Sequence, residues 1–358
     1  MSWLVDDEDD GDYAEYDDSA ARVRPNPKGN KPRSKNRPEH ADAVSGRVFS
    51  VDRGRYGVWV DENTPEERQL VAAKARELGK SAGDRTQDRK VSVVTGDWVD
   101  LVGDVSADEG SLARIVRIQP RTTLLRRSAD DTDAVERIIV ANADQMLIVV
   151  AAADPEPRPR LVDRYLVAAF DAGITPILCI TKTDLVDPSG FLANFAGLDL
   201  RVFQSRSDDF SLEEIRAALL GHTTVAVGHS GVGKSTLVNA LVPEANRAVG
   251  RVNYVTGRGR HTSSSTVSYR IGTGWIVDTP GVRSFGLGHI DPSNILRSFT
   301  DLALLAEDCP RGCTHLPDAP DCAIIDGVAA LRLGELGALR LESFQRLITT
   351  LGSTTVST

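Results

Sequence analysis

Nine consecutive residues, Gly228–Thr236 (GHSGVGKST), have the spacing of a phosphate-binding loop, G-x-x-x-x-G-K-[ST]. Glycines let backbone N–H groups curl around phosphate oxygens, and a helix N-terminus behind them adds positive potential. We expect Lys234 to bridge the β- and γ-phosphates and Ser235 to ligate Mg²⁺. The rest of the loop would also contact nucleotide: Gly228, His229, Ser230, Gly231, Val232, Gly233 and Thr236. Within it, we expect His229 to pack rather than to catalyse.

A second loop, TKTD, could read the base of that nucleotide and comprises Thr181, Lys182, Thr183 and Asp184. The Asp184 carboxylate would accept hydrogen bonds from N1 and N2 of guanine, and the stem of Lys182 would lie along the ring. Adenine lacks that donor pair, so the loop predicts binding of GTP rather than ATP. In this chain the base-reading loop comes before the phosphate loop.

A third motif, DTPG, ends an apolar segment and runs from Asp278 to Gly281. Asp278 would hold Mg²⁺ through water, and the Gly281 N–H would sense the γ-phosphate. In the Gly- and Ser-rich segment before it, the Thr262 hydroxyl would reach Mg²⁺, with Ser263 as the alternative. Small GTPases often place a water-orienting Gln after DxxG, but Val282 stands there. His261, a bound partner or a metal ion would then order the water, and His261 is our catalytic candidate beside Lys234.

Three of the four cysteines and one histidine form a compact cluster. Three thiolates and an imidazole complete a tetrahedral Zn²⁺ site with no open position, so we expect one structural zinc ion. The fourth cysteine, Cys179, lies in an apolar strand and is expected to be inert. The predicted ligands are Cys309, Cys313, His315 and Cys322.

The patterning around these motifs predicts three folded parts behind a charged tail, residues 1–41. Residues 42–127 read as short strands, among them 90–94, and predict an all-β barrel of the oligonucleotide-binding (OB) type. From 128 to 290, buried strands alternate with helices, which predicts a mostly parallel sheet that binds ligands at its carboxyl ends. Residues 291–358 are predicted to be helical around the Cys/His cluster.

Charge neither requires nor excludes a nucleic-acid partner. The net charge of −9 resides in nine acidic side chains between Asp6 and Asp18, so the rest of the chain is neutral overall. Seven basic residues follow between Arg22 and Arg37; a solubilising tail is the simpler interpretation, and an RNA-touching arm the alternative. A basic stripe near the end of the barrel is either a phosphate-tracking surface or a solvated strand face, and it contains Arg114, Arg117, Arg121, Arg126 and Arg127. The apolar runs are too short to span a bilayer, so we expect a cytoplasmic protein with no membrane partner.

TKTD before GHSGVGKST, then GRGRHT, DTPGVRSFG and the Cys/Cys/His/Cys cluster resembles the circularly permuted ribosome small-subunit-dependent GTPase A family (RsgA, also called YjeQ or EngC). The resemblance runs from about residue 42 onward. It implies an OB-type barrel, a permuted GTPase core and a zinc domain. It further implies late maturation of the small ribosomal subunit, contact with its rRNA, and GTP hydrolysis stimulated by the subunit.

The chain departs from the family pattern in its base-contacting loops, and its zinc-ligand spacings differ by about a residue from the commoner family pattern. Thr181 replaces the Asn of NKxD, and Ser205-Arg206-Ser207 poorly matches the second base-contacting loop. The alternative function is a GTP-gated RNA-binding or signalling switch with another partner. We expect a monomer that binds GTP and GDP. Because Gly281 lies close in sequence to Cys309, we also expect hydrolysis to move the zinc domain.

Overall fold

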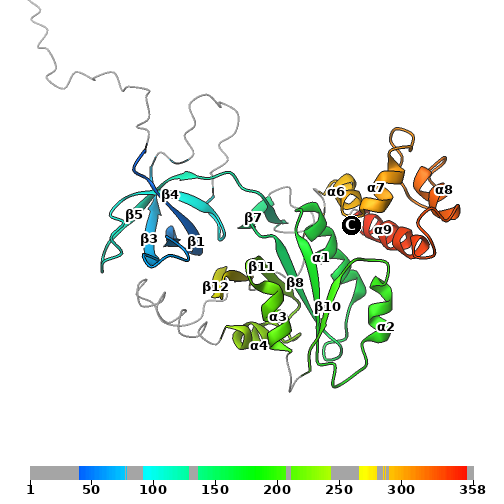
Figure 1. Ribbon diagram of the computed structural model, residues 1–358, viewed down its shortest axis with the longest axis horizontal. Coiled ribbons are helices and arrows are strands. Elements are labelled where there is room, and N and C mark those ends of the chain that lie inside the picture. Colours follow the sequence, from blue (N-terminus) through cyan, green and yellow to red (C-terminus); the bar gives the residue numbers. More distant parts are fainter. Residues whose placement is uncertain are drawn as a thin grey trace, which may run out of the picture. The chain divides into compact units, whose positions relative to one another are not determined.

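The computed structural model describes residues 40–76, 78, 92–128, 136–206, 211–242, 266–279, 285, 287 and 290–352. The described residues from Asp42 onward belong to one unit. Their strands form a continuous sheet with the order β10-β9-β8-β11-β13-β12-β1-β2-β3-β5-β4, together with a separate two-stranded hairpin. Both the predicted barrel and the predicted nucleotide-binding sheet therefore contribute strands to one hydrogen-bonded array (Figure 1).

The first five strands close into a barrel because β1 pairs with both β2 and β4. The cyclic order 1-2-3-5-4 is that of the OB-type barrel. Alternate residues of β2 point inward and join a separate apolar core that includes Val48, Val58 and Ile115. The strands are β1 (Val44–Asp52), β2 (Arg55–Val60), β3 (Arg68–Lys74), β4 (Trp98–Gly103) and β5 (Ala113–Ile118).

Two details of the barrel differ from the sequence prediction. β3 was not predicted, because apolar and polar residues alternate only weakly in its sequence. It is stabilised as a strand by pairing with β2 on one side and β5 on the other. The strand predicted at 90–94 does not form over its described residues, 92–94. Val93 and Val94 are nonetheless buried, and the Val94 N–H donates to the Asp97 carboxylate at 2.8 Å. Their apolar character reflects burial in a loop rather than strand pairing.

The nucleotide-binding sheet contains five parallel strands in the order β10-β9-β8-β11-β13, with β12 antiparallel to β13. Every residue of β8 is buried because apolar clusters cover both faces of the sheet. The strands are β8 (Gln145–Ala151), β9 (Thr175–Thr181), β10 (Arg201–Gln204), β11 (Thr223–Gly228), β12 (Val267–Ile271) and β13 (Gly274–Asp278). β12 was not predicted from the sequence.

Helices cover this sheet on its two faces (Figure 1). One apolar cluster contains residues of α1 (Pro159–Asp171) and the short segment α2 (Ser189–Leu192) with its 3-10 turn Ala193–Phe195. The other contains residues of α3 (Leu212–Leu219) and α4 (Lys234–Leu241). A hairpin of β6 (Leu124–Ser128) and β7 (Glu136–Ala141) spans the predicted domain boundary at residue 127.

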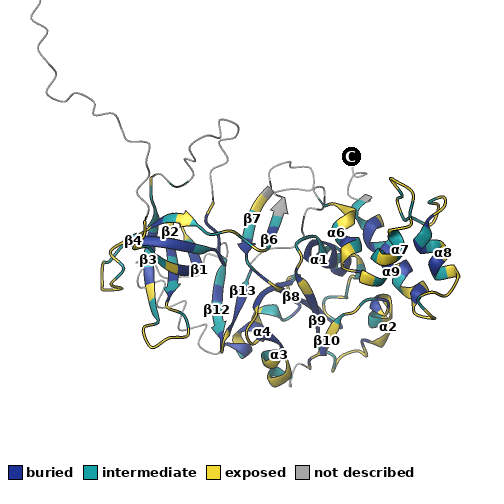
Figure 2. Cartoon of the chain, turned by 45° about the horizontal axis from the view of Figure 1, so that its top comes forward, coloured by how far each residue is buried: buried dark blue, intermediate teal, exposed yellow. Residues whose placement is uncertain are grey.

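The C-terminal helices join the first of these clusters instead of building a core of their own. Leu302, Ile324 and Phe344 belong to the same apolar cluster as Ile148 and Tyr165 of the sheet and α1. The helices are α6 (Pro292–Arg297), α7 (Thr300–Ala306), α8 (Ala323–Ala329) and α9 (Gly337–Gly352). In Figure 2, α6 and α9 lie next to α1, and α7 and α8 lie beyond them. None of the helices in the described residues has the length and apolarity that a membrane crossing requires.

Candidate nucleotide site and Cys/His cluster

The predicted nucleotide motifs gather at one edge of the parallel sheet. β9 ends at Thr181, β11 at Gly228 and β13 at Asp278. Because these strands are parallel, their carboxyl ends face the same way, and the loops that follow them lie together. Base reading, phosphate binding and metal binding can therefore act on one ligand, although the base-reading loop comes first in the chain.

The glycines of the phosphate loop fulfil steric requirements. Gly231 and Gly233 have φ values of +86° and +87°, which a side chain would strain. At Gly228, a Cβ atom would approach the Val149 carbonyl oxygen to 2.6 Å. α4 begins at Lys234, so the loop leads into a helix N-terminus, where anions are favoured.

The predicted phosphate cation and the predicted metal carboxylate are in contact. Lys234 Nζ forms an ion pair with Asp278 Oδ1, and both side chains are largely buried. The next residue, Thr279, is also fixed, because its hydroxyl donates to the Ala226 carbonyl at 2.9 Å. The phosphate loop and the first half of DTPG therefore share one small polar centre.

The predicted guanine-reading loop is braced directly against the phosphate loop. The Thr181 hydroxyl is buried and donates to the Val232 carbonyl at 2.6 Å. Lys182 Nζ donates to the Asp154 carbonyl, which belongs to the loop after β8. Thr181 stands where the family pattern often has Asn, and its hydroxyl supplies a bracing contact despite the change.

Two residues at this edge were not assigned a role from the sequence, Asp154 and Ser205. The Thr183 N–H donates to the Ser205 carbonyl at 3.2 Å, so the segment after β10 lies beside TKTD. The Ser205 side chain is fully buried, and its hydroxyl has no hydrogen-bond partner among the described residues. The sequence did not assign Ser205 to the second base-contacting loop, because Arg206 stands where that loop usually has Ala after Ser. The position of Ser205 directly after β10 nonetheless brings it beside TKTD.

Other predicted residues lie outside the described residues. These are His261, Thr262 and Gly281, together with Ser263 and Val282. The charged tail up to residue 39 is outside them as well. The catalytic, metal-binding and γ-phosphate-sensing roles given to these residues stay predictions.

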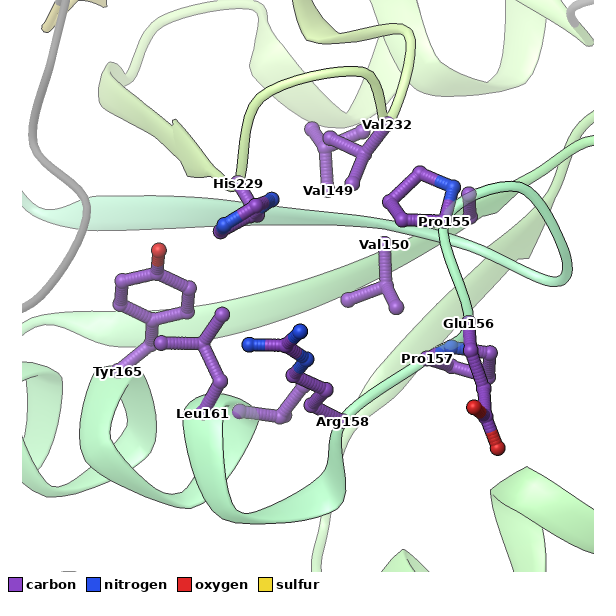
Figure 3. A pocket seen from close by; sticks show the side chains of 12 residues that line it. Val149, Val150, Pro155, Glu156, Pro157, Arg158, Leu161, Tyr165, His229 and Val232 are labelled. Atoms are coloured by element: carbon purple, nitrogen blue, oxygen red, sulfur yellow. The ribbon is translucent and has the colours of Figure 1, made fainter.

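A small pocket lies behind the phosphate loop, between that loop, the end of β8 and the start of α1 (Figure 3). Its lining is mainly apolar, and its polar residues are Glu156, Arg158, Tyr165 and His229. His229 Nδ1 is 3.0 Å from the Ser230 carbonyl oxygen. The His229 ring therefore lines this pocket.

The Cys/His cluster has the geometry of a tetrahedral metal site. The ligand atoms of Cys309, Cys313, His315 and Cys322 all lie within 4.8 Å of one another. His315 Nδ1 is 3.6 Å from both Cys309 Sγ and Cys322 Sγ, and those two sulfurs are 4.0 Å apart. Bond lengths of about 2.0–2.3 Å around zinc give separations of roughly 3.5–3.8 Å, close to the three distances above, so the cluster could hold Zn²⁺.

Two further expectations can be compared with the structure. Cys179 is fully buried, and burial raises the pKa of its thiol to about 12, so it is inert core as expected. Two members of the basic stripe pair with carboxylates of the barrel: Arg117, whose side chain is 73% exposed, with Asp100, and the largely buried Arg121 with Asp97. Arg121 is therefore held within the barrel, whereas Arg117 lies on a solvated strand face.

The fold and the site define a circularly permuted P-loop GTPase. Two solved structures share the fold. The structure of YloQ, a circularly permuted GTPase, matches with a TM-score of 0.61 and 24% sequence identity, and the match covers 89% of this chain and 98% of YloQ. The structure of YjeQ from Thermotoga maritima matches with a TM-score of 0.58 and 22% identity, and the match covers 86% of this chain and 98% of YjeQ. Residues 118–288 match the family model described as RsgA GTPase.

Curated relatives agree with this match. The small ribosomal subunit biogenesis GTPase RsgA of Chromohalobacter salexigens is 36% identical over 84% of this chain and 88% of its own length. The protein of the same name from Pseudomonas aeruginosa is 37% identical over 74% and 77%. The chain therefore belongs to the RsgA GTPase family, and it is a GTPase.

Proposed function

We propose that this GTPase acts in late maturation of the small ribosomal subunit, binds that subunit and its rRNA, and hydrolyses GTP faster when bound to it. The observation that carries the proposal is the match to relatives named for small-subunit biogenesis over 84% of this chain. The OB-type barrel supports an RNA partner, since such barrels bind oligonucleotides. The setting would be the cytoplasm, with the protein acting as a monomer.

At the nucleotide site, Lys234 would neutralise charge on the β- and γ-phosphates, and Asp184 with Lys182 would select guanine. Ser235 and Thr262 would hold Mg²⁺, which supplies charge neutralisation at the phosphates, with Asp278 behind it. His261 would orient the attacking water, and the Gly281 N–H would contact the γ-phosphate. The contact between Lys234 and Asp278 supports a shared phosphate and metal site.

The Cys/His cluster would hold one structural Zn²⁺. Its four ligand atoms leave no position for a reacting group, so its role would be to fix the C-terminal helices. We propose 42–127, 128–290 and 291–358 as the domains, except that the β6–β7 hairpin, which begins at Leu124, would belong to the second of them.

The decisive experiment measures GTP hydrolysis by the full chain with and without purified small subunits. We expect stimulation by small subunits and none by large subunits. An absence of stimulation, with normal GTP binding, would favour a GTP-gated switch that has another partner.

Three variants would test the assigned residues. Lys234→Ala should reduce turnover by about 10²-fold or more, as loss of a group that stabilises transition-state charge does. Asp184→Asn should reduce the preference for GTP over ATP by at least about tenfold, because a hydrogen bond to a charged group is lost.

Cys313→Ala should lower bound zinc below one equivalent per chain. Undiminished zinc content would disprove the assignment of Cys313 as a ligand.

A further inference from the structure

β12 is held along two edges by different parts of the chain. It pairs with β13 along its whole length, from Val267 opposite Asp278 to Ile271 opposite Gly274. On its other edge, Val267 pairs with Ser50 of barrel strand β1. The Thr95 hydroxyl, also from the barrel, donates to the Thr266 carbonyl at 3.1 Å. β12 is therefore fastened to the barrel. It directly precedes β13, which ends at Asp278, the carboxylate proposed to act at the metal.

Arg270 of β12 makes several side-chain contacts across this junction. Its guanidinium forms an ion pair with Glu67 and donates to Asn63 Oδ1 at 2.7 Å, both in the β2–β3 connection of the barrel. It also lies 5.9 Å from the Trp59 ring centroid, within cation–π range. Glu67 in turn accepts the Asn63 N–H at 2.8 Å, so the acceptors are held in place.

Arg47 of β1 extends the junction to the strands that carry the nucleotide loops. Its guanidinium is buried between Trp98 and Trp275, at 5.8 and 5.4 Å from their ring centroids. It donates to the Thr223 hydroxyl at the start of β11, whose other end is the phosphate loop. Trp275 belongs to β13, whose other end is Asp278. One barrel arginine thus touches both strands that deliver the phosphate and metal groups.

We propose that the contacts of Arg270 with Glu67 and of Thr95 with Thr266, named here the β12 clamp, transmit binding at the barrel to the nucleotide site. This inference rests on the proposed function, because small subunits are the stimulus. A shift of the barrel moves β12 through the clamp, and β12 moves Asp278 through its shared ladder with β13. Directional hydrogen bonds and ion pairs suit this task, because they can exchange partners without opening a core.

The test uses the full chain and purified small subunits. We would measure subunit binding with a GTP analogue, basal hydrolysis and stimulated hydrolysis for Arg270→Glu, Glu67→Arg and the doubly substituted chain. Each single reversal should lose fivefold or more of the stimulation, about the lower limit of ordinary coupling between sites. Basal hydrolysis and subunit binding should stay within about twofold, and the double reversal should restore stimulation by re-forming the pair.

A matched control is Arg68→Glu, which breaks the ion pair with Asp61 inside the barrel, one position from Glu67. It should leave stimulation unchanged. If a charge reversal impairs folding, as judged by GTP binding, Arg270→Gln is measured instead and should show the same selective loss.

The outcomes separate the two proposals. If the unmodified chain is not stimulated by small subunits, the proposed function fails. If it is stimulated and the single reversals are stimulated equally, the clamp proposal is overturned while the proposed function stands. Loss of stimulation that the double reversal does not restore would also overturn the clamp.

Discussion

Two junctions join the nucleotide-binding sheet to its neighbours, and they differ in chemistry. The barrel keeps a separate apolar core and meets the sheet through arginines, carboxylates, hydroxyls and tryptophans. The C-terminal helices share one apolar cluster with the sheet and α1. Interiors pack as tightly as crystals, so a shared core resists movement more than a polar contact does.

This difference changes the expected output of hydrolysis. The short sequence between DTPG and Cys309 suggested that the zinc domain moves. However, Phe285, just past that motif, is buried with its ring 5.7 Å from that of Tyr165, and Arg346 of α9 contacts Asp163 at 3.2 Å. The C-terminal helices are thus fastened to α1 at several points, which makes the barrel junction the better candidate for the moving part.

Metal removal should have the largest effect, because the cluster organises helices that belong to the shared core. Stripping zinc with a chelator should lower the midpoint of thermal unfolding by roughly 10 °C or more, because a structural zinc site contributes on the order of 10 kcal/mol and a loss of that size shifts the midpoint by about that much in a chain of this length. Calorimetry with and without chelator, followed by zinc readdition, checks this. A midpoint that does not change would show that the C-terminal helices are independent of metal.

Phe344→Ala should come next, with a loss of about 3–5 kcal/mol of unfolding free energy, as for other buried aromatic truncations. Phe344 is 1% exposed, and its ring packs 5.4 Å from that of Phe299. Because the core is shared, GTP binding and helical signal should be lost together in denaturant. Glu342→Ala, on the exposed side of α9, is the control. Separate transitions for the two signals would contradict a shared core.

The pH dependence of stability should have opposite signs at the two junctions. Burial raises the pKa of Asp163, which is 1% exposed, whereas the hydrogen bond from Arg270 chiefly lowers that of Glu67. A raised carboxyl pKa gives stability that is present below the unfolded pKa and is lost as pH rises through the folded value. A lowered one gives stability that is present above the unfolded pKa and is lost as pH falls through the folded value.

Comparison with neutral variants isolates these contributions. The unfolding free energy of the unmodified chain minus that of Asp163→Asn should decrease as pH rises from about 4. The same difference for Glu67→Gln should decrease as pH falls below about 4.3. Denaturant titrations at several pH values measure both, and slopes of the same sign would contradict the assigned environments.

Thr95→Val should have the smallest effect on stability, about 0.5–1.5 kcal/mol, because one buried hydrogen bond is lost with little change in shape. It should still reduce small-subunit stimulation, since Thr95 belongs to the β12 clamp. Thr64→Val also removes a hydroxyl-to-carbonyl hydrogen bond, an exposed one to the Asp61 carbonyl of the barrel, and should not affect stimulation. Equal stimulation of both variants would remove Thr95 from the clamp.

Motifs with strict local chemistry were predictable from the sequence. The glycines of the phosphate loop, the cysteine spacing and the buried run of β8 each encode their geometry within a few residues. β3, β12 and the place of Ser205 were not predictable, because they depend on pairing with distant strands. The neutralisation of Arg121 by Asp97, 24 residues away in sequence, is non-local in the same way.

Hydrogen exchange in β12 and α9 tests the central contrast most directly. Amide exchange would be measured for the full chain bound to a GTP analogue and bound to GDP. The account predicts that exchange at Val267–Ile271 differs between the two nucleotides, while exchange in Gly337–Gly352 stays the same. A difference in exchange in α9, with exchange in β12 unaltered, would contradict the account. It would indicate that GTP hydrolysis moves the C-terminal helices instead.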